Sequence, residues 1–541
     1  MTIAPFLSDE RRRAMAASGA WGDRTLLDAF EAVARATPAR PAVISYDTAS
    51  GGRIALSYGE LAARVEWIAA GLARLGIGAG DIVAFQLPNW WQFVAIHLAA
   101  LRIGAVSNPL MPIFREHELT FMLRLAEARL LIVPARFRGF DHEAMALGLR
   151  EAVPSLRHVL AIGGSGETAF ETLLDAPASA LEGRRRAGPD AVIQLLYTSG
   201  TTGEPKGAMH TSNTLLHNVD RIVERLGLSD RDVGFMASPL AHQTGFLIGM
   251  MLPLWLGARA VLQDVWNPAA AVQIIGAEGV TFTMASTPFL ADLARAAEGR
   301  AAEVASLRVF ISAGAPIPRV LVRQATEVLG AHVVSGWGMT EVGLVTMATP
   351  GDPPEKAFET DGGPVPASEV RVVDANGAAL PAGTEGRLQS RGPSTFVGYL
   401  KRPQWYGVDA EGWFETGDLA RLDADGYLRI TGRSKDIIIR GGENVPVVEV
   451  EQLIYRHPAV LEVAIVGMPD ARLGERACAF VVLRGGTALG FPELRAWLEQ
   501  NHVAKNYWPE RLEVTTELPK TPSGKVQKFR LRELAKRFAP Q

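Results

Sequence analysis

One segment places glycines, hydroxyls and a lysine at a spacing suited to holding an anion. It runs from Thr198 to Gly207 as TSGTTGEPKG and directly follows the apolar run AVIQLLY. Glycines let the backbone bend and bring N–H groups close to an anion, while hydroxyls and Lys206 add donors and charge. The pattern therefore predicts a loop for nucleotide phosphates, against the alternative of a small-residue surface turn. The candidate residues are Thr198, Ser199, Gly200, Thr201, Thr202, Gly203 and Lys206. The Walker spacing G-x-x-x-x-G-K-[ST] is absent from the sequence, which weakens any ATPase or kinase interpretation.

Alternating strand and helix patterns indicate how such a loop would be positioned. Buried strands are expected within 81–87, 129–134, 158–163, 191–197, 258–264, 280–286 and 307–314. Amphipathic stretches such as 56–76 separate them, and this alternation predicts an α/β core with mainly parallel sheets. From about residue 360, turn signals recur every few residues between short strands, which is typical of a β-rich module. The last part of the chain reads as a small α+β domain.

Composition excludes several classes of protein. The chain has 541 residues, 48% hydrophobic and 21% charged, with a net charge of −3, so extensive disorder and a dedicated nucleic-acid binder are disfavoured. The single cysteine, Cys478, rules out an internal disulfide framework and an all-thiolate zinc site. No secretion signal is visible, and the uncharged apolar run at 245–258 is too short to cross a bilayer, so a buried core segment and a cytoplasmic protein are expected.

The phosphate-binding segment resembles that of the adenylate-forming enzymes, which include acyl-CoA synthetases, peptide-synthetase adenylation domains and firefly-type luciferases. Five further segments match this family in order: SAGAP (312–316), SGWGMTE (335–341), ETGDLA (415–420), ITGRSKDIIIRGGEN (430–444) and PKTPSGKVQK (519–528). The resemblance implies an N-terminal body (1–433) of two α/β sheet subdomains plus a β-barrel-like subdomain. It also implies a small, mobile α+β C-terminal domain (434–541) with a hinge near Lys435. ATP, Mg²⁺ and coenzyme A are the implied cofactors.

The resemblance also implies roles for individual residues on the nucleotide side. Trp337 offers a flat face for adenine, Thr340 a hydrogen bond to the α-phosphate, and Glu341 an oxygen ligand for Mg²⁺. Taken alone, the same residues are typical of a strand end followed by a helix N-cap. Further adenine- or ribose-side candidates are Gly314, Ala315, Pro316, Gly338, Met339, Asp418 and Arg433. Taken alone, Asp418 in its Thr-Gly-Asp segment is more typical of ordinary turn chemistry.

The resemblance also implies residues that interact with the acid and with the thiol. Lys525 matches the lysine that stabilises the transition state of adenylate formation, although a lone lysine in a Pro-Gly loop is usually an exposed one. Gly441, Gly442 and Glu443 match the loop that lines the pantetheine tunnel, or a simple hairpin turn. The C-terminal stretch from Lys505 onward carries nine Lys and Arg against four Asp and Glu, a charge balance that suits a polyanionic small molecule such as CoA.

The segment SPLAHQTGF (238–246) lies where the family builds its acyl pocket. It contains no acidic residue, so the ammonium of an amino acid would be left unpaired at high cost, and an amino-acid substrate is disfavoured. His242 matches the residue beside the carboxylate entrance, or is a satisfied core histidine. By position in the family, Phe246, Ala313, Gly338 and Met339 are candidate lining residues. The opening WGDRTLLDAFEAVA and the close VQKFRLREL are similar to medium-chain acyl-CoA and cyclohexanecarboxylate-CoA ligases.

These features predict an ATP-dependent acid–CoA ligase for a medium-chain or alicyclic carboxylic acid, with no nucleic-acid partner and no integral membrane segment. The sequence leaves open whether the protein forms a homodimer. One rival keeps the adenylation but passes the acyl group to a carrier-protein phosphopantetheine or another acceptor. A second rival is a noncatalytic nucleotide-binding protein of the same fold. It is disfavoured because the phosphate-binding segment, Glu341 and Lys525 are all present.

Overall fold

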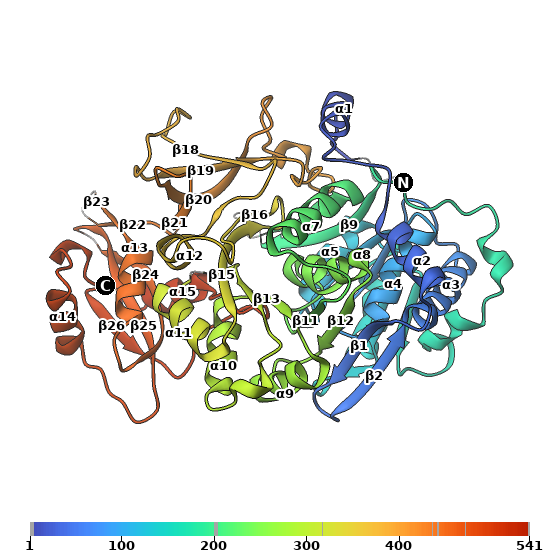
Figure 1. Ribbon diagram of the computed structural model, residues 1–541, viewed down its shortest axis with the longest axis horizontal. Coiled ribbons are helices and arrows are strands. Elements are labelled where there is room, and N and C mark those ends of the chain that lie inside the picture. Colours follow the sequence, from blue (N-terminus) through green and yellow to red (C-terminus); the bar gives the residue numbers. More distant parts are fainter. Residues whose placement is uncertain are drawn as a thin grey trace.

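The computed structural model describes residues 5–199, 204–315, 317–434, 436–440, 443–470 and 472–538. Two large sheets form the body of the molecule, and smaller β-rich units lie beside them (Figure 1). The elongated shape ends in the C-terminal segments on one side. On the other side it ends in α2 (Leu26–Ala36), α3 (Tyr58–Arg74) and the teal segment beside them (Figure 1). Among the described residues, no helix is both long enough and apolar enough to span a bilayer.

The first large sheet has nine strands in the order β17-β16-β15-β14-β13-β11-β12-β1-β2. The strands are β1 (Pro41–Asp47), β2 (Gly52–Ser57), β11 (Val233–Met236), β12 (Arg259–Gln263), β13 (Phe282–Ala285), β14 (Val309–Ser312), β15 (His332–Met339), β16 (Gly343–Met347) and β17 (Gly363–Pro364). Pairing is parallel from β1 to β15 and antiparallel at both edges. Strands paired in parallel end at one edge, which collects the segments that follow them.

The second large sheet has six strands in the order β10-β9-β4-β3-β5-β8. They are β3 (Ile82–Phe85), β4 (Val106–Pro109), β5 (Leu130–Pro134), β8 (His158–Ile162), β9 (Val192–Ser199) and β10 (Pro205–Thr211). Only β9 and β10 pair antiparallel, which makes them a hairpin around the predicted phosphate loop. The two parallel sheets confirm the expected α/β class. β4 was missed because its sequence, VSNP, is short and half polar although every residue is buried.

The helices of the body alternate with these strands, as the sequence predicts. They are α1 (Asp9–Ala17), α2 (Leu26–Ala36), α3 (Tyr58–Arg74), α4 (Trp91–Arg102), α5 (Glu116–Ala126), α6 (His142–Ala152), α7 (Ser212–Leu226), α8 (Leu252–Leu256), α9 (Pro268–Glu278), α10 (Thr287–Ala297), α11 (Arg319–Leu329) and α12 (Pro354–Glu359). The stretch 56–76 begins its helix two residues late, because Ser57 ends β2 and caps α3 through the backbone N–H of Glu60.

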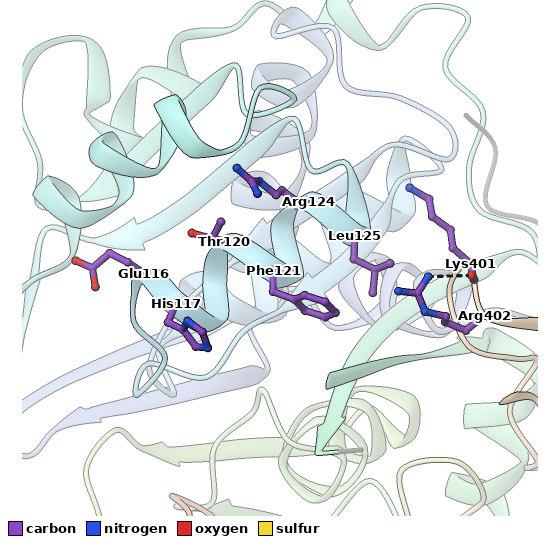
Figure 2. Close-up of a pocket in the computed structure, with 8 residues that line it drawn as sticks. All are labelled: Glu116, His117, Thr120, Phe121, Arg124, Leu125, Lys401 and Arg402. Carbon is purple, nitrogen blue, oxygen red and sulfur yellow. Dashed lines mark hydrogen bonds between the residues drawn. The ribbon is translucent and has the colours of Figure 1, made fainter. Parts of the chain in front are cut away.

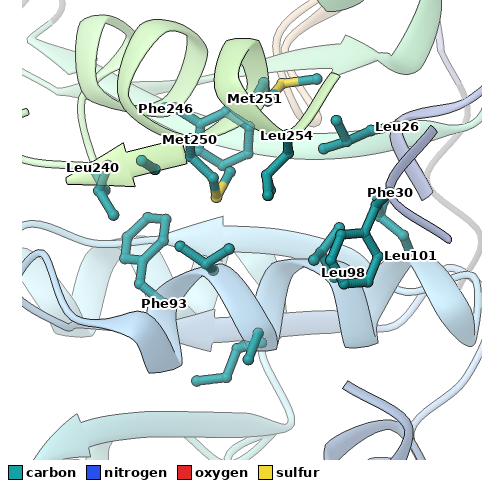
Figure 3. Close-up of a cluster of buried hydrophobic side chains, with 14 of the residues drawn as sticks. Leu26, Phe30, Phe93, Leu98, Leu101, Leu240, Phe246, Met250, Met251 and Leu254 are labelled. Atoms are coloured by element: carbon teal, nitrogen blue, oxygen red, sulfur yellow. The ribbon is translucent and has the colours of Figure 1, made fainter. Parts of the chain in front are cut away.

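The uncharged segment near 245–258 is buried, as expected. Gly245–Met251 forms a π-helix that continues into α8. Its side chains pack on α4 and α2, where the largest described core cluster lies (Figure 3). Phe246 is fully buried, with its ring 4.8 Å from His97 and 6.4 Å from Phe93.

The β-rich module and the C-terminal part follow the expected order. The module is a four-stranded antiparallel sheet of β18 (Glu369–Val373), β19 (Gly386–Arg391), β20 (Phe414–Leu422) and β21 (Leu428–Arg433). The C-terminal sheet contains β22 (Ile438–Arg440), β23 (Glu443–Val445), β24 (Val460–Asp470), β25 (Gly474–Leu483) and β26 (Arg511–Val514). Its helices are α13 (Val447–Tyr455), α14 (Phe491–Gln500) and α15 (Lys528–Lys536). Cys478 lies fully buried in β25, and burial raises the pKa of its thiol to about 12.

A buried ion pair joins the nine-stranded sheet to the β-rich module. Arg319 on α11 contacts Asp361 at 2.9 Å and donates to the carbonyl of Thr360. The second carboxylate oxygen of Asp361 accepts the backbone N–H of Ile430 at 2.9 Å. Removing the guanidinium would leave a carboxylate buried without its cation.

We expect Arg319→Met to lower the free energy of unfolding by about 3–5 kcal/mol. Arg323 lies on the same helix and pairs with Glu359, but both side chains are nearly half exposed. Arg323→Met is therefore the matched control, with an expected loss below about 1 kcal/mol. Urea unfolding followed by tryptophan fluorescence measures both variants, and equal losses would contradict the assignment.

Candidate active site

The predicted phosphate segment is built on the β9–β10 hairpin. Thr198 and Ser199 end β9, and Lys206 lies in β10 directly opposite Thr198. The four residues between, Gly200, Thr201, Thr202 and Gly203, lie outside the described residues. The hairpin thus presents Thr198 and Lys206 from neighbouring strands at the same end of the six-stranded sheet.

Two aromatic rings hold the Lys206 ammonium. Its Nζ lies 5.1 Å from the ring centre of Tyr399 and 4.9 Å from that of Trp405. Cation–π contacts of this kind stabilise an ammonium without neutralising its charge. The charge of Lys206 therefore stays available to an anion at the hairpin.

Trp337, Asp418 and Arg433 meet although they come from three strands. The indole N–H of Trp337 donates to one oxygen of Asp418 at 2.8 Å, and Arg433 Nε contacts the other at 2.9 Å. Asp418 on β20 and Arg433 on β21 are also cross-strand partners. Asp418 is only 3% exposed, and these two contacts give each of its buried oxygens a partner.

Gly338 and Met339 follow Trp337 on β15. A side chain at position 338 would lie 2.1 Å from the carbonyl oxygen of Gly343, so only glycine permits the approach of β16 at this point. Gly314 and Ala315 follow β14, the strand that pairs with β15, and Gly314 has a φ of +86°.

Glu341 is buried just beyond β15, with only 4% of its surface exposed. Its carboxylate accepts the hydroxyl of Tyr399 at 2.7 Å, and Thr198 Oγ1 lies 3.5 Å away. The Glu341 carbonyl accepts the backbone N–H of Phe396 at 2.7 Å. Burial raises the pKa of Glu341, although the Tyr399 hydroxyl and the charges of Lys206 and Arg433 oppose the rise.

A histidine that the sequence reasoning missed supports the backbone of Thr340. His210 on β10 has Nε2 at 2.7 Å from the Thr340 carbonyl and Nδ1 at 3.0 Å from the Thr214 hydroxyl. Burial lowers the pKa of His210 to about 4, so its imidazole is neutral at pH 7. A neutral imidazole donates from Nε2 here and accepts at Nδ1, which fixes its tautomer.

Lys525 from the C-terminal part lies among these groups. Burial first and the charge of Arg433 second lower the pKa of Lys525 to about 8, while Asp418 and Glu341 act in the opposite direction. Burial and the charge of Lys525 also lower the pKa of His242 to about 4. The structure therefore brings His242, Glu341, Asp418, Arg433 and Lys525 into one electrostatic cluster.

The loop that carries Lys525 is docked on the body. Ser286, which precedes α10, donates its hydroxyl to the Ser523 carbonyl at 2.6 Å. Gly524 has a φ of +82°, and a Cβ there would lie 2.5 Å from the Ser286 hydroxyl. Within the loop, the backbone of Lys525 bonds Thr521 through both its N–H and its carbonyl.

Other predicted residues are described only in part. Pro316, Lys435, Gly441 and Gly442 lie outside the described residues, and only the backbone of Glu443 is described, opposite Arg440 in β23. Most of the basic C-terminal stretch is engaged in ion pairs. The paired residues are Lys505, Arg511, Lys520, Lys528, Arg532 and Lys536.

A surface groove of about 680 Å³ is present on the body. Figure 2 shows it between one face of α5 and the segment Lys401–Arg402. No predicted site residue is among its described lining residues. The groove therefore provides no support for the predicted acyl or nucleotide pockets.

Glu341 fits a site for a divalent cation held mainly by a ligand. Among the described residues it makes no ion pair, although it is buried and its pKa is raised. No cluster of three or more metal-ligating side chains occurs in the described ranges. This combination suits Mg²⁺, which is usually bound through one or two carboxylates plus substrate phosphates.

The fold and this cluster of residues define an adenylate-forming enzyme, and comparisons with known proteins agree. Residues 30–400 match the family model of AMP-binding enzymes, and residues 449–525 match that of the AMP-binding enzyme C-terminal domain. The chain belongs to this adenylate-forming superfamily, as a ligase that activates an acid for transfer to CoA or a carrier.

Individual relatives cover almost the whole chain. The medium-chain fatty-acid–CoA ligase of Escherichia coli is 37% identical, over 98% of this chain and 94% of the relative. The salicyl-AMP ligase/salicyl-S-ArCP synthetase of Mycobacterium tuberculosis is 36% identical, over 97% and 93%. The crystal structure of ATP-bound MatB from Rhodopseudomonas palustris superposes with a TM-score of 0.85 at 28% identity, over 95% of this chain and all of that one.

The position of Lys525 between charges of both signs gives a direct test of the cluster. We expect the Lys525 ammonium to titrate at about pH 8 in the ligand-free protein. Arg433→Met removes a neighbouring positive charge and should raise this pKa, whereas Asp418→Asn removes a negative one and should lower it. NMR titration of ¹³C-methylated lysines, assigned with Lys525→Arg, measures the shifts. If the titration midpoint of Lys525 is unchanged in both variants, Lys525 does not lie near Arg433 and Asp418.

Proposed function

We propose that the protein is an ATP-dependent carboxylic acid–CoA ligase. The observation that carries the proposal is the cluster of His242, Glu341, Asp418, Arg433 and Lys525, which five separate segments bring together. A noncatalytic protein of this fold would have no need to bury the Lys525 ammonium, since burial of a charge is costly.

The first half-reaction joins the acid to AMP. A carboxylate oxygen of the acid attacks the α-phosphorus of ATP, and the bond to the β-phosphate oxygen breaks to release pyrophosphate. Lys525 donates hydrogen bonds to the carboxylate and the α-phosphate, where negative charge increases in the transition state. Thr198, Lys206 and the hairpin backbone hold the phosphates, and Thr340 donates to the α-phosphate.

In this proposal, separate sets of residues bind the nucleoside and the metal. Trp337 and the segment at Gly314 line the adenine site, while Asp418 and Arg433 bind the ribose. Glu341 would hold Mg²⁺, which supplies charge neutralisation for the phosphates when bound. The buried position of Glu341 next to Thr198 supports this role, because both lie at the hairpin that carries Lys206.

The second half-reaction transfers the acyl group to the CoA thiol. The thiolate sulfur attacks the carbonyl carbon of the adenylate, and AMP leaves. We propose that residues 434–541 form a separate domain that turns about a hinge near Lys435, so that Gly441, Gly442 and Glu443 line the thiol's path. The protein's own thiol, Cys478, is buried with a raised pKa and is unsuited to this attack.

The acid is proposed to be a medium-chain or alicyclic carboxylic acid without an α-ammonium group. The segment 238–246 has no acidic side chain, and Gln243 within it is buried with no described partner for its amide. His242 is neutral at pH 7, so it does not compete with Lys525 for the carboxylate as a second cation. The relative from Escherichia coli bears the name of a medium-chain fatty-acid ligase.

We expect Lys525→Ala to slow adenylate formation by about 10²–10³-fold, because a donor aimed at the developing charge is lost. Exchange of labelled pyrophosphate into ATP measures this step. Transfer to CoA from supplied acyl-adenylate should stay nearly unchanged. Lys520 lies in the same loop and pairs with Glu462 at 2.6 Å, so Lys520→Ala is the matched control. Equal loss in both half-reactions would remove the role proposed for Lys525.

The acceptor and the acid are tested together. AMP release should depend on added CoA and should be slower with a holo-carrier protein. A panel of linear C4–C12, cyclohexane and aromatic carboxylates identifies the preferred acid. Faster turnover with the holo-carrier would favour the second candidate function, a carrier-loading synthetase, as the relative from Mycobacterium tuberculosis is named. Absence of pyrophosphate exchange with every acid would favour the noncatalytic alternative.

A further inference from the structure

The N-terminal strap, residues 5–22, docks on the body through polar contacts. It contains α1, which has no fully buried residue and stands apart from α2 and α3 (Figure 1). The backbone N–H of Phe6 donates to the Val397 carbonyl at 2.7 Å, and the Trp21 indole donates to the Pro393 carbonyl at 3.1 Å. Both ends of the strap thus bind one segment, 393–406.

Arg11 is the central contact between the strap and this segment. Its Nη1 donates to the Tyr406 hydroxyl at 2.8 Å and to the Phe396 carbonyl at 3.2 Å, and its Nη2 donates to the Thr395 carbonyl at 2.5 Å. The Trp21 ring lies 5.5 Å from the guanidinium. Burial lowers the pKa of Arg11, so the protein places a charge here at a cost.

The segment that Arg11 binds is the one that holds Glu341. Phe396 donates its backbone N–H to the Glu341 carbonyl, and Tyr399 donates its hydroxyl to the Glu341 carboxylate, each at 2.7 Å. The rings of Phe396 and Tyr399 are 4.7 Å apart, with Tyr406 5.3 Å from Phe396. Arg11 therefore binds the carbonyl of Phe396, the same residue whose backbone N–H binds Glu341.

The fit between strap and segment is close. Gly398 has a φ of +116°, and a Cβ at this position would overlap the Phe6 ring at 1.9 Å. The same segment supplies Tyr399 and Trp405, whose rings contact the Lys206 ammonium. Displacement of the segment would move the partners of both Glu341 and Lys206.

We propose that Arg11 is a positioning residue for the phosphate side of the active site. It acts through the backbone of Phe396 and the ring of Tyr399 to fix the Glu341 carboxylate that would hold Mg²⁺. The inference rests on the proposed function in its use of Glu341 as the metal ligand. It extends that function to a residue 330 positions earlier in the chain.

The test uses Arg11→Met in the full-length protein, with and without ligands. Without ligands, hydrogen exchange of peptides covering 395–400 should accelerate about tenfold, since hydrogen bonds to a charged donor are lost. In pyrophosphate exchange, the Mg²⁺ concentration for half-maximal rate should rise by about tenfold for the same reason. Transfer to CoA from supplied acyl-adenylate should be unchanged.

Two further variants serve as controls for this test. Arg13 lies on the same helix with an exposed side chain, so Arg13→Met is the matched control and should alter neither readout. Arg11→Lys keeps the charge and should restore part of the Mg²⁺ response. It also serves as the test variant if Arg11→Met fails to fold.

The outcomes separate this inference from the proposed function. Equal loss of both half-reactions in Arg11→Met, or an unaltered Mg²⁺ dependence, would overturn the positioning role. Glu341→Gln tests the underlying assumption: if it leaves the Mg²⁺ dependence unchanged, the metal assignment of Glu341 fails whatever Arg11 does. Tyr399→Phe combined with Arg11→Met should raise the Mg²⁺ requirement by less than the product of the single effects, because both act on one carboxylate.

Discussion

Burial of charge is the constraint on which the active site depends. Glu341 and Asp418 are each less than 5% exposed, and Lys525 has a pKa lowered to about 8. A buried ion is stable only if other groups donate to it or neutralise it. Here these partners come from distant segments: Trp337 and Arg433 satisfy Asp418, and Tyr399 satisfies Glu341. The two parallel sheets and the β-rich module are needed together because each supplies one part of this set.

The parts of the molecule that the sequence predicts well are those with a local signal. Apolar runs of strand length correspond to β3, β5, β8, β12, β13 and β14, and the ordered motifs place Trp337, Glu341, Asp418, Arg433 and Lys525 within one region. Errors fall where a local signal is weak. VSNP at β4 is too polar to be predicted as a strand, yet all four residues are buried and the strand pairs with β3 and β9. Helix α3 starts at a capping serine that also ends a strand.

The supporting residues carry no local signal at all. His210, Tyr399 and Arg11 are single residues whose importance comes from what they touch across 130, 58 and 385 positions of the chain. A buried histidine bonded to the Thr340 carbonyl is indistinguishable in sequence from any other histidine in a strand. Only the three-dimensional arrangement shows that the residues orienting Thr340 and Glu341 lie outside the motifs that contain them.

Hydrogen bonds and an exposed ion pair join the C-terminal part to the body. Besides the Ser286–Ser523 hydrogen bond, Arg421 pairs with Glu449 at 3.1 Å, and Arg429 donates to Gln452 at 3.0 Å. The Arg421–Glu449 pair is about 40% exposed on both sides, and such pairs contribute at most about 1 kcal/mol. Burial of Lys525 disfavours its charged form, as its lowered pKa shows. The negative charge of a bound phosphate beside Lys525 would favour the charged ammonium in this position. In the proposed mechanism, departure of pyrophosphate lowers that contribution, and this favours the proposed turn of residues 434–541 toward the thiol step.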